Sequence, residues 1–215
     1  MKVVIVGSGG HARVLADVIL AQRDRYELLG FTDCDSDKWG TSIFGYPVLG
    51  SDGDLVDHSP DSFFLINGIG STRDTKKRAD LFSFFKNKDF HFCSIISNFS
   101  YLSERTVCGE GLQLISGGVI HPGCKLGDNV LINTRASVDH DCIIGDHVHI
   151  APGATLSGGV SVGEGAHIGS GATIIQGIVV GADALVAAGA VVTADVGPGA
   201  VVAGVPAESI SLVIK

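Results

Sequence analysis

The 215-residue sequence has few basic residues and no long apolar run. Its 15 Lys and Arg are outnumbered by 23 Asp and Glu, which gives a formal net charge of -8. This acidity argues against nucleic acid or an anionic membrane as the main partner, because both attract basic surfaces. No stretch approaches 18 uninterrupted apolar residues, and the opening MKVVIVGSGG breaks into glycines too early for a signal peptide. We therefore expect a cytoplasmic protein without a nucleic-acid or membrane partner.

The sequence also lacks paired cysteine motifs. Its five cysteines are odd in number and show no C-x-x-C spacing, so the sequence indicates neither a disulfide framework nor a zinc ribbon. We expect reduced thiols.

Glycine, in contrast, is abundant, and a repeat explains why. The chain contains 30 glycines, about twice the usual share. From residue 94 to residue 195 it divides into seventeen hexads without an insertion, and sixteen of the seventeen third positions are aliphatic. First positions are small or aliphatic, whereas the fourth to sixth positions favour Gly, Asp, Asn and Pro, which are typical of sharp corners.

Each hexad is therefore predicted to form a short strand followed by a corner. First and third positions alternate to the same side of a strand and are expected to point into the core. Three hexads close a triangular coil, so residues 18 apart should stack in parallel ladders. Cys124 and Cys142 are 18 apart at first positions and are predicted to be stacked core thiols.

The first 93 residues have the pattern of a small βαβ domain. Gly7, Gly9 and Ala12 fit G-x-G-x-x-A between an apolar strand and an amphipathic helix, and Asp33 ends the next strand. Free amides at a helix N-terminus form an anion site, so we expect a nucleotide diphosphate as the ligand. The alternative interpretation is that the glycines only permit a tight turn between strand and helix. Downstream, the pattern predicts a hairpin over 40–51, a strand over 62–71 and a helix over 72–88. We expect two domains, 1–93 and 94–215.

Residues 137–153, SVDHDCIIGDHVHIAPG, concentrate three histidines and three aspartates. A metal site, a catalytic base with a helper, and polar side chains on ordinary corners are three interpretations. The hexad register sends His140 to one corner and His149 to an outward position in the next third of the coil. Because zinc needs ligands that converge at about 2 Å, we expect no metal site in one chain. An imidazole at an exposed corner has the chemistry of a general base.

Joint motifs identify a family resemblance over essentially the whole chain. VIVGSGGHARVLADVI, the run NTRASVDHDCIIGDHVHIAPGATLSGGVSVGEGAHIG and the ending VVAGVPA resemble the bacterial sialic acid O-acetyltransferases, whose close relatives N-acetylate UDP-4-amino-4,6-dideoxy sugars. The resemblance implies a half-Rossmann-like α/β domain followed by a left-handed parallel β-helix. It also implies a homotrimer with acetyl-CoA lying between two β-helices and a nucleotide sugar on the N-terminal domain.

The resemblance also implies roles for particular residues. The catalytic set is His140, Asp141 and Asn133; the acetyl-CoA contacts are His149, Gly158, Ser170 and Ala188; the nucleotide-sugar contacts are Gly9, Gly10, His11, Asp33, Gly70 and Ser71. The chain departs from the family pattern at three positions. Asp141 stands where relatives often have Glu, Ala188 replaces a glycine, and Cys34 replaces the second of two consecutive acids.

Three functions follow from these motifs. The first is transfer of acetyl from acetyl-CoA to the amino group of a UDP-4-amino-4,6-dideoxy sugar by His-assisted direct attack. The second keeps the fold and chemistry but acetylates a hydroxyl of sialic acid or a related sugar. The third is a non-catalytic β-helix that binds a nucleotide sugar.

Overall fold

A computed structural model describes residues 1–211 and divides the chain into two compact units. Unit 1 comprises residues 1–70 and 77–95, and unit 2 comprises residues 71–76 and those from 96 onward. The boundary between residues 93 and 94 stays a prediction, and the last four residues of the expected second domain, 212–215, lie outside the described residues.

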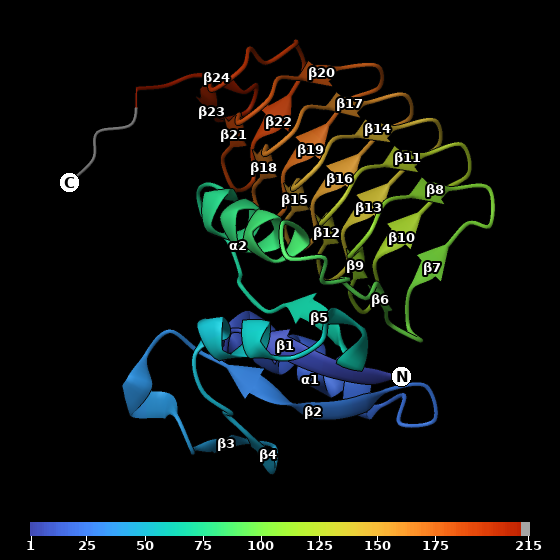
Figure 1. Cartoon of the computed structure of the whole chain (residues 1–215). Coiled ribbons are helices and arrows are strands. Elements are labelled where there is room, and N and C mark those ends of the chain that lie inside the picture. Colours follow the sequence, from blue (N-terminus) through green and yellow to red (C-terminus); the bar gives the residue numbers. More distant parts are fainter. Residues whose placement is uncertain (212–215) are drawn as a thin grey trace. The chain divides into compact units, whose positions relative to one another are not determined.

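Unit 1 is built on a three-stranded parallel sheet in the order β2-β1-β5 (Figure 1). Val4 and Val6 of β1 pack in one core with Phe82 and Phe85 of α2. Alternation sends the other buried side chains of β1 to the opposite face, where α1 buries an apolar stripe. The elements are β1 (Lys2–Val6), α1 (Gly10–Leu20), β2 (Glu27–Thr32), β3 (Ser42–Ile43), β4 (Tyr46–Pro47), β5 (Phe64–Asn67) and α2 (Lys76–Lys86), with short 3-10 turns at Ser36–Lys38, Asp52–Asp57 and Pro60–Ser62.

The expected hairpin is present as the antiparallel pair β3 and β4. The expected helix over 72–88 is shorter, because α2 begins only at Lys76. The Asp74 carboxylate accepts a hydrogen bond from the Lys76 amide at 3.1 Å, a local turn that marks the start of the helix. The preceding segment instead belongs to unit 2, where Thr75 Oγ1 donates to the Gly165 carbonyl at 2.9 Å.

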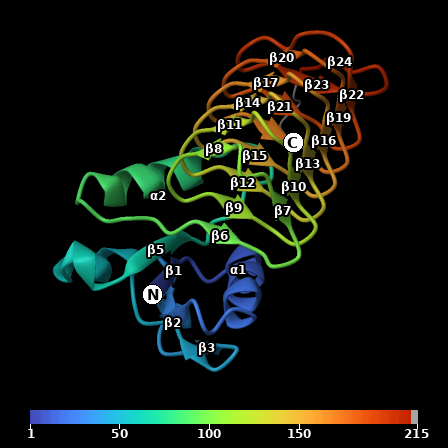
Figure 2. The same cartoon turned by 90° about the vertical axis from the view of Figure 1, so that its right-hand side faces the viewer.

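Unit 2 is a parallel β-helix in which every hexad from 94 to 195 contributes one two-residue strand, at its second and third positions. The strands stack into three faces, which Figure 2 shows as rows along successive coils. Face A holds β7 (Tyr101–Leu102), β10 (Val119–Ile120), β13 (Ser137–Val138), β16 (Thr155–Leu156), β19 (Thr173–Ile174) and β22 (Val191–Val192). Face B holds β8 (Val107–Cys108), β11 (Lys125–Leu126), β14 (Ile143–Ile144), β17 (Ser161–Val162) and β20 (Val179–Val180). Face C holds β6 (Ile95–Ile96), β9 (Gln113–Leu114), β12 (Leu131–Ile132), β15 (His149–Ile150), β18 (His167–Ile168), β21 (Leu185–Val186), β23 (Val201–Ala203) and β24 (Glu208–Ser209).

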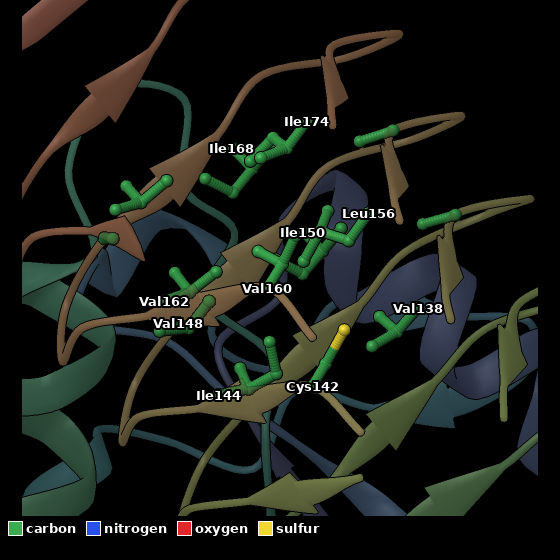
Figure 3. Close-up of a cluster of buried hydrophobic side chains, with 14 of the residues drawn as sticks. Val138, Cys142, Ile144, Val148, Ile150, Leu156, Val160, Val162, Ile168 and Ile174 are labelled. Carbon is green, nitrogen blue, oxygen red and sulfur yellow. The ribbon is translucent and has the colours of Figure 1, made fainter. Parts of the chain in front are cut away.

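The ladder register has the predicted spacing of 18 residues. Val119 pairs with Ser137 on face A, and Leu131 pairs with His149 on face C. First- and third-position side chains fill the interior, as Figure 3 shows for Val138, Cys142 and Ile144. Cys124 and Cys142 are both buried in this core.

The regular spacing ends after Asp195. In β23, Val201 pairs with Leu185, a separation of 16 rather than 18 residues, and β24 then pairs with β23 in the antiparallel direction. The fold class expected from the sequence, an α/β domain followed by a left-handed parallel β-helix, is confirmed.

Candidate active site

His140 and Asp141 lie at the corner between faces A and B, which we call the A/B corner. His140 Nδ1 lies 2.8 Å from Asp141 Oδ2, and the His140 amide donates to Asp139 Oδ1 at 2.7 Å. Asp141 adopts a left-handed backbone conformation with φ of 61°, which an aspartate tolerates better than most residues. The two side chains are 53% and 71% exposed, so the pair is open to a substrate.

This geometry fixes which imidazole nitrogen is available. The hydrogen bond that the His140 ring makes to the Asp141 carboxylate raises the pKa of His140 above its ordinary 6.5. Burial opposes this rise, and the charges of Asp139 and Asp141 add to it. Because Nδ1 bonds the carboxylate, the open nitrogen is Nε2, and no residue among 1–211 forms a hydrogen bond with it. The pair has the geometry of a general base with a carboxylate that orients it.

A second group of predicted residues surrounds His149, on face C. His149 Nδ1 lies 2.6 Å from Ser71 Oγ, and its Nε2 lies 3.1 Å from Asn133 Nδ2. The Asn133 Oδ1 atom accepts from the Thr134 amide at 2.8 Å, which directs the Asn133 amide group toward the ring as a donor. His149 Nε2 is therefore the acceptor and Nδ1 carries the proton toward Ser71.

The side chain of His149 was predicted to lie on an outer face of the coil, and it does, but neither it nor its neighbour His167 is accessible. His149 is 3% exposed and His167 is 4% exposed, and their rings meet edge to face with centroids 4.7 Å apart. Burial lowers the pKa of His167, which keeps this imidazole neutral at pH 7. Segment 71–76 accounts for part of this cover through the contact between Ser71 and His149.

A groove of about 480 Å³ follows the same face of unit 2. Its lining includes Ser170 and Ala188, at the corner between faces C and A, together with Ser71, Asn133 and His149. Arg73 also lines the groove, and nothing in the sequence pattern distinguished it.

The predicted catalytic and acetyl-CoA residues therefore fall into two groups on one chain. His140, Asp141 and Gly158 lie at the A/B corner, whereas Asn133 precedes β13 at the corner between faces C and A. Strand β13 separates Asn133 from His140.

In unit 1, Asp33 lies within a network of donors at the end of β2. Its carboxylate accepts from the Ser8 hydroxyl, from the Ser8 amide at 3.2 Å, from the Asp35 amide at 3.0 Å and from Lys38 Nζ at 3.0 Å. Burial raises the pKa of Asp33, but the hydrogen bonds from Ser8, Asp35 and Lys38 outweigh it and lower the pKa to about 2. Asp33 thus ties the glycine turn to the loop that follows β2.

The remaining predicted nucleotide-sugar residues of unit 1 line one cavity of about 290 Å³. Gly9, Gly10, His11 and Gly70 contribute to its wall, and Gly9 caps α1 without a side-chain hydrogen bond. The N-terminus of α1, the positive end of the helix dipole, therefore borders this cavity. Sequence reasoning missed Lys38, which brings a cation to the wall. Ser71, predicted alongside Gly70, belongs to unit 2.

Two features of the residues that the structure describes bear on other functions. Residues 1–211 contain no cluster of three or more His, Cys, Asp or Glu side chains suited to a metal ion. In the same residues, every helix is too short or too polar to cross a bilayer.

Comparison with known proteins places these features in a family. Residues 2–82 match the family model described as the PglD N-terminal domain, and residues 115–158 match the bacterial transferase hexapeptide model. A comparison with curated protein sequences gives no match.

Several solved structures match the chain over nearly its whole length. The acetyltransferase domain of PglB from Neisseria gonorrhoeae, in complex with acetyl coenzyme A, is 34% identical, with 97% of this chain and 98% of that chain covered and a TM-score of 0.89. PerB from Caulobacter crescentus, in complex with CoA and GDP-perosamine, is 34% identical, with 98% of each chain covered and a TM-score of 0.89. WeeI from Acinetobacter baumannii is 28% identical, with 98% and 100% covered and a TM-score of 0.87. The chain therefore belongs to the family of hexapeptide-repeat sugar acetyltransferases.

Proposed function

We propose that this protein transfers the acetyl group of acetyl-CoA to the amino group of a nucleotide-activated sugar, of the UDP-4-amino-4,6-dideoxy class, with His140 as the general base. The observation that carries the proposal is the exposed His140–Asp141 pair, whose Nε2 is open to a substrate. The full-length similarity to an acetyltransferase bound to acetyl-CoA and to PerB bound to CoA and GDP-perosamine supports the reaction class.

The reaction can proceed by direct attack. The sugar amine forms a bond with the thioester carbonyl carbon while His140 Nε2 takes a proton from the nitrogen. The tetrahedral intermediate then expels the CoA sulfur, and the imidazolium returns the proton to it, which gives the acetamido sugar and free CoA. Asp141 holds Nδ1, fixes the tautomer and stabilises the imidazolium. The two cysteines nearest this corner, Cys124 and Cys142, are buried in the core of the β-helix, so neither thiol is exposed to form an acyl-enzyme.

We further propose that the protein acts as a homotrimer with active sites between subunits. The reason is the separation of the two groups of residues on one chain, His140 and Asp141 at the A/B corner and the groove with Ser170 and Ala188 elsewhere. A neighbouring β-helix would bring one group to the other. Acetyl-CoA would occupy the groove, and Asn133 would act there by orienting His149.

The nucleotide would bind to unit 1. The cavity has Gly9, Gly10 and His11 at the start of α1, where a helix N-terminus favours a diphosphate. Lys38 also lines the cavity and is paired there with Asp33. Because Lys38 and Ser8 already engage Asp33, this carboxylate would serve mainly to shape the phosphate turn. PerB was solved in complex with GDP-perosamine, a guanine nucleotide sugar. Binding measurements with UDP and GDP therefore decide which nucleotide this protein accepts.

Thiol release from acetyl-CoA tests the proposal on a panel of nucleotide amino sugars. We expect His140→Ala to lower kcat by roughly 10² to 10⁴ with little change in the KM for acetyl-CoA. His147→Ala is the matched control, because His147 belongs to the next corner and bonds Asn129. Near wild-type turnover by His140→Ala would remove His140 from the mechanism.

The acceptor is decided by the same panel together with thermal shifts. Stabilisation by UDP and turnover of a UDP amino sugar support the amine acceptor. Turnover of sialic acid in their place would identify an O-acetyltransferase. Nucleotide-sugar binding without CoA release from any acceptor would identify a binding protein.

A further inference from the structure

Gly158 is the only glycine at the fifth position of the seventeen hexads between residues 94 and 195. Every other fifth position carries a side chain, including Pro122 and Gln176 at the same A/B corner of other coils. Residue 158 is one full coil beyond His140, so the exception occurs at the corner stacked on the proposed base.

The structure shows what the missing side chain would meet. A β-carbon on residue 158 would lie 2.6 Å from both Cε1 and Nε2 of His140 and 3.2 Å from Cδ2. Contacts below 3.0 Å are not tolerated between such atoms, so the imidazole would have to move. The displaced atoms include Nε2, the nitrogen that the proposed function assigns to proton transfer.

Backbone conformation does not explain this glycine. Gly158 lies outside the left-handed region, so alanine is compatible with its backbone. Its neighbour Gly159 differs on both counts, because Gly159 has φ of 68° and an added β-carbon would have no atom within 4 Å.

We propose that Gly158 is a positioning residue: because it has no side chain, the His140 ring can pack against the Gly158 Cα, and this packing holds Nε2 in position for proton transfer. This inference rests on the proposed function of His140. It differs from a cofactor contact through the Gly158 backbone, because an alanine keeps the backbone amide and changes only the space beside the ring.

The test is Gly158→Ala, with kinetics and NMR titration of His140. We expect kcat to fall by about 10- to 100-fold, as for a small displacement of a reacting group, and the KM for acetyl-CoA to stay within about twofold. The pKa of His140 should fall toward 6.5, because the displaced ring loses its 2.8 Å contact with Asp141. Thermal stability should change little, because the ring is half exposed and the bond from the Gly159 amide to the His140 carbonyl at 2.9 Å remains.

A control and a double variant isolate the effect. Gly197→Ala places a methyl group on an exposed glycine of unit 2 with no atom within 4 Å of the new β-carbon, and all readouts should match the wild type. In a His140→Ala background, Gly158→Ala should change the residual rate less than about twofold, because its effect passes through the ring.

Two results would overturn the inference: an unchanged His140 pKa with wild-type kcat in Gly158→Ala, or an equal loss of rate in the His140→Ala background. Failure of the proposed function looks different. If the wild type acetylates no amino sugar, the NMR titration of His140 with and without Gly158→Ala still decides whether the glycine seats the ring.

Discussion

Asp33→Asn removes the charge from a carboxylate that accepts hydrogen bonds from five donor groups in unit 1, which belong to Ser8, Cys34, Asp35 and Lys38. Hydrogen bonds from Ser8, Asp35 and Lys38 outweigh burial and lower the pKa of Asp33 from 3.8 to about 2. This difference between the folded and unfolded chain corresponds to about 2 kcal/mol of folding free energy at pH 7. We expect Asp33→Asn to lose about that amount.

The sign of the pH dependence follows from the lowered pKa. The carboxylate stabilises the fold at every pH above its unfolded value of 3.8, and this contribution disappears as the pH falls toward about 2. The difference between wild type and Asp33→Asn should therefore be constant from pH 5 to 7 and shrink to roughly half near pH 3.

Urea unfolding followed by tryptophan fluorescence provides the assay. Trp39 is the single tryptophan of the chain, and its Nε1 donates to the Asp33 carbonyl at 2.8 Å, so the signal reports on unit 1. A difference that stays the same between pH 3 and pH 7 would refute the electrostatic account. Equal stability of the two proteins at pH 7 would show that the network contributes nothing.

Two further predictions concern the β-helix. Asp141→Asn should return the pKa of His140 toward 6.5. Because the base must be neutral to accept a proton, the acidic limb of the kcat/KM profile should move to lower pH, and kcat should fall. An acidic limb that stays in place would exclude Asp141 as the partner of His140. Asn133→Ala removes the donor to Nε2 of buried His149. It should lower the free energy of unfolding by about 1–3 kcal/mol, measured in thermal or urea melts. A melt that matches the wild type would show that the hydrogen bond is dispensable.

The β-helix could be predicted from sequence because its determinants are local and repeat. Alternation within each hexad assigns Val138 and Ile144 to the core, and the corner residues set the turn without help from distant parts of the chain. The pairing of His140 with Asp141 is equally local, because the two residues are adjacent at one corner.

The contacts of segment 71–76 could not be predicted. Ser71 and His149 are 78 residues apart, and no periodicity relates them. The outward position of His149 correctly placed its ring outside the coil, but only the tertiary contact shows that the ring is covered. Lys38 was missed for a similar reason, because a lysine in a loop gives no sign that it bonds Asp33 until the backbone brings it there.

The ladder spacing constrains how this chain can change in length. The strands of each coil between residues 94 and 195 pair with strands of the adjacent coils, as Thr155 does with Thr173. An excised or duplicated block of three whole hexads would leave the remaining ladders paired, whereas the loss of one residue would turn third-position side chains out of the core. Insertions and deletions within residues 94–195 should therefore be accepted in multiples of 18 residues, and under the proposed role of Gly158 an active variant must also keep the coils of His140 and Gly158 adjacent.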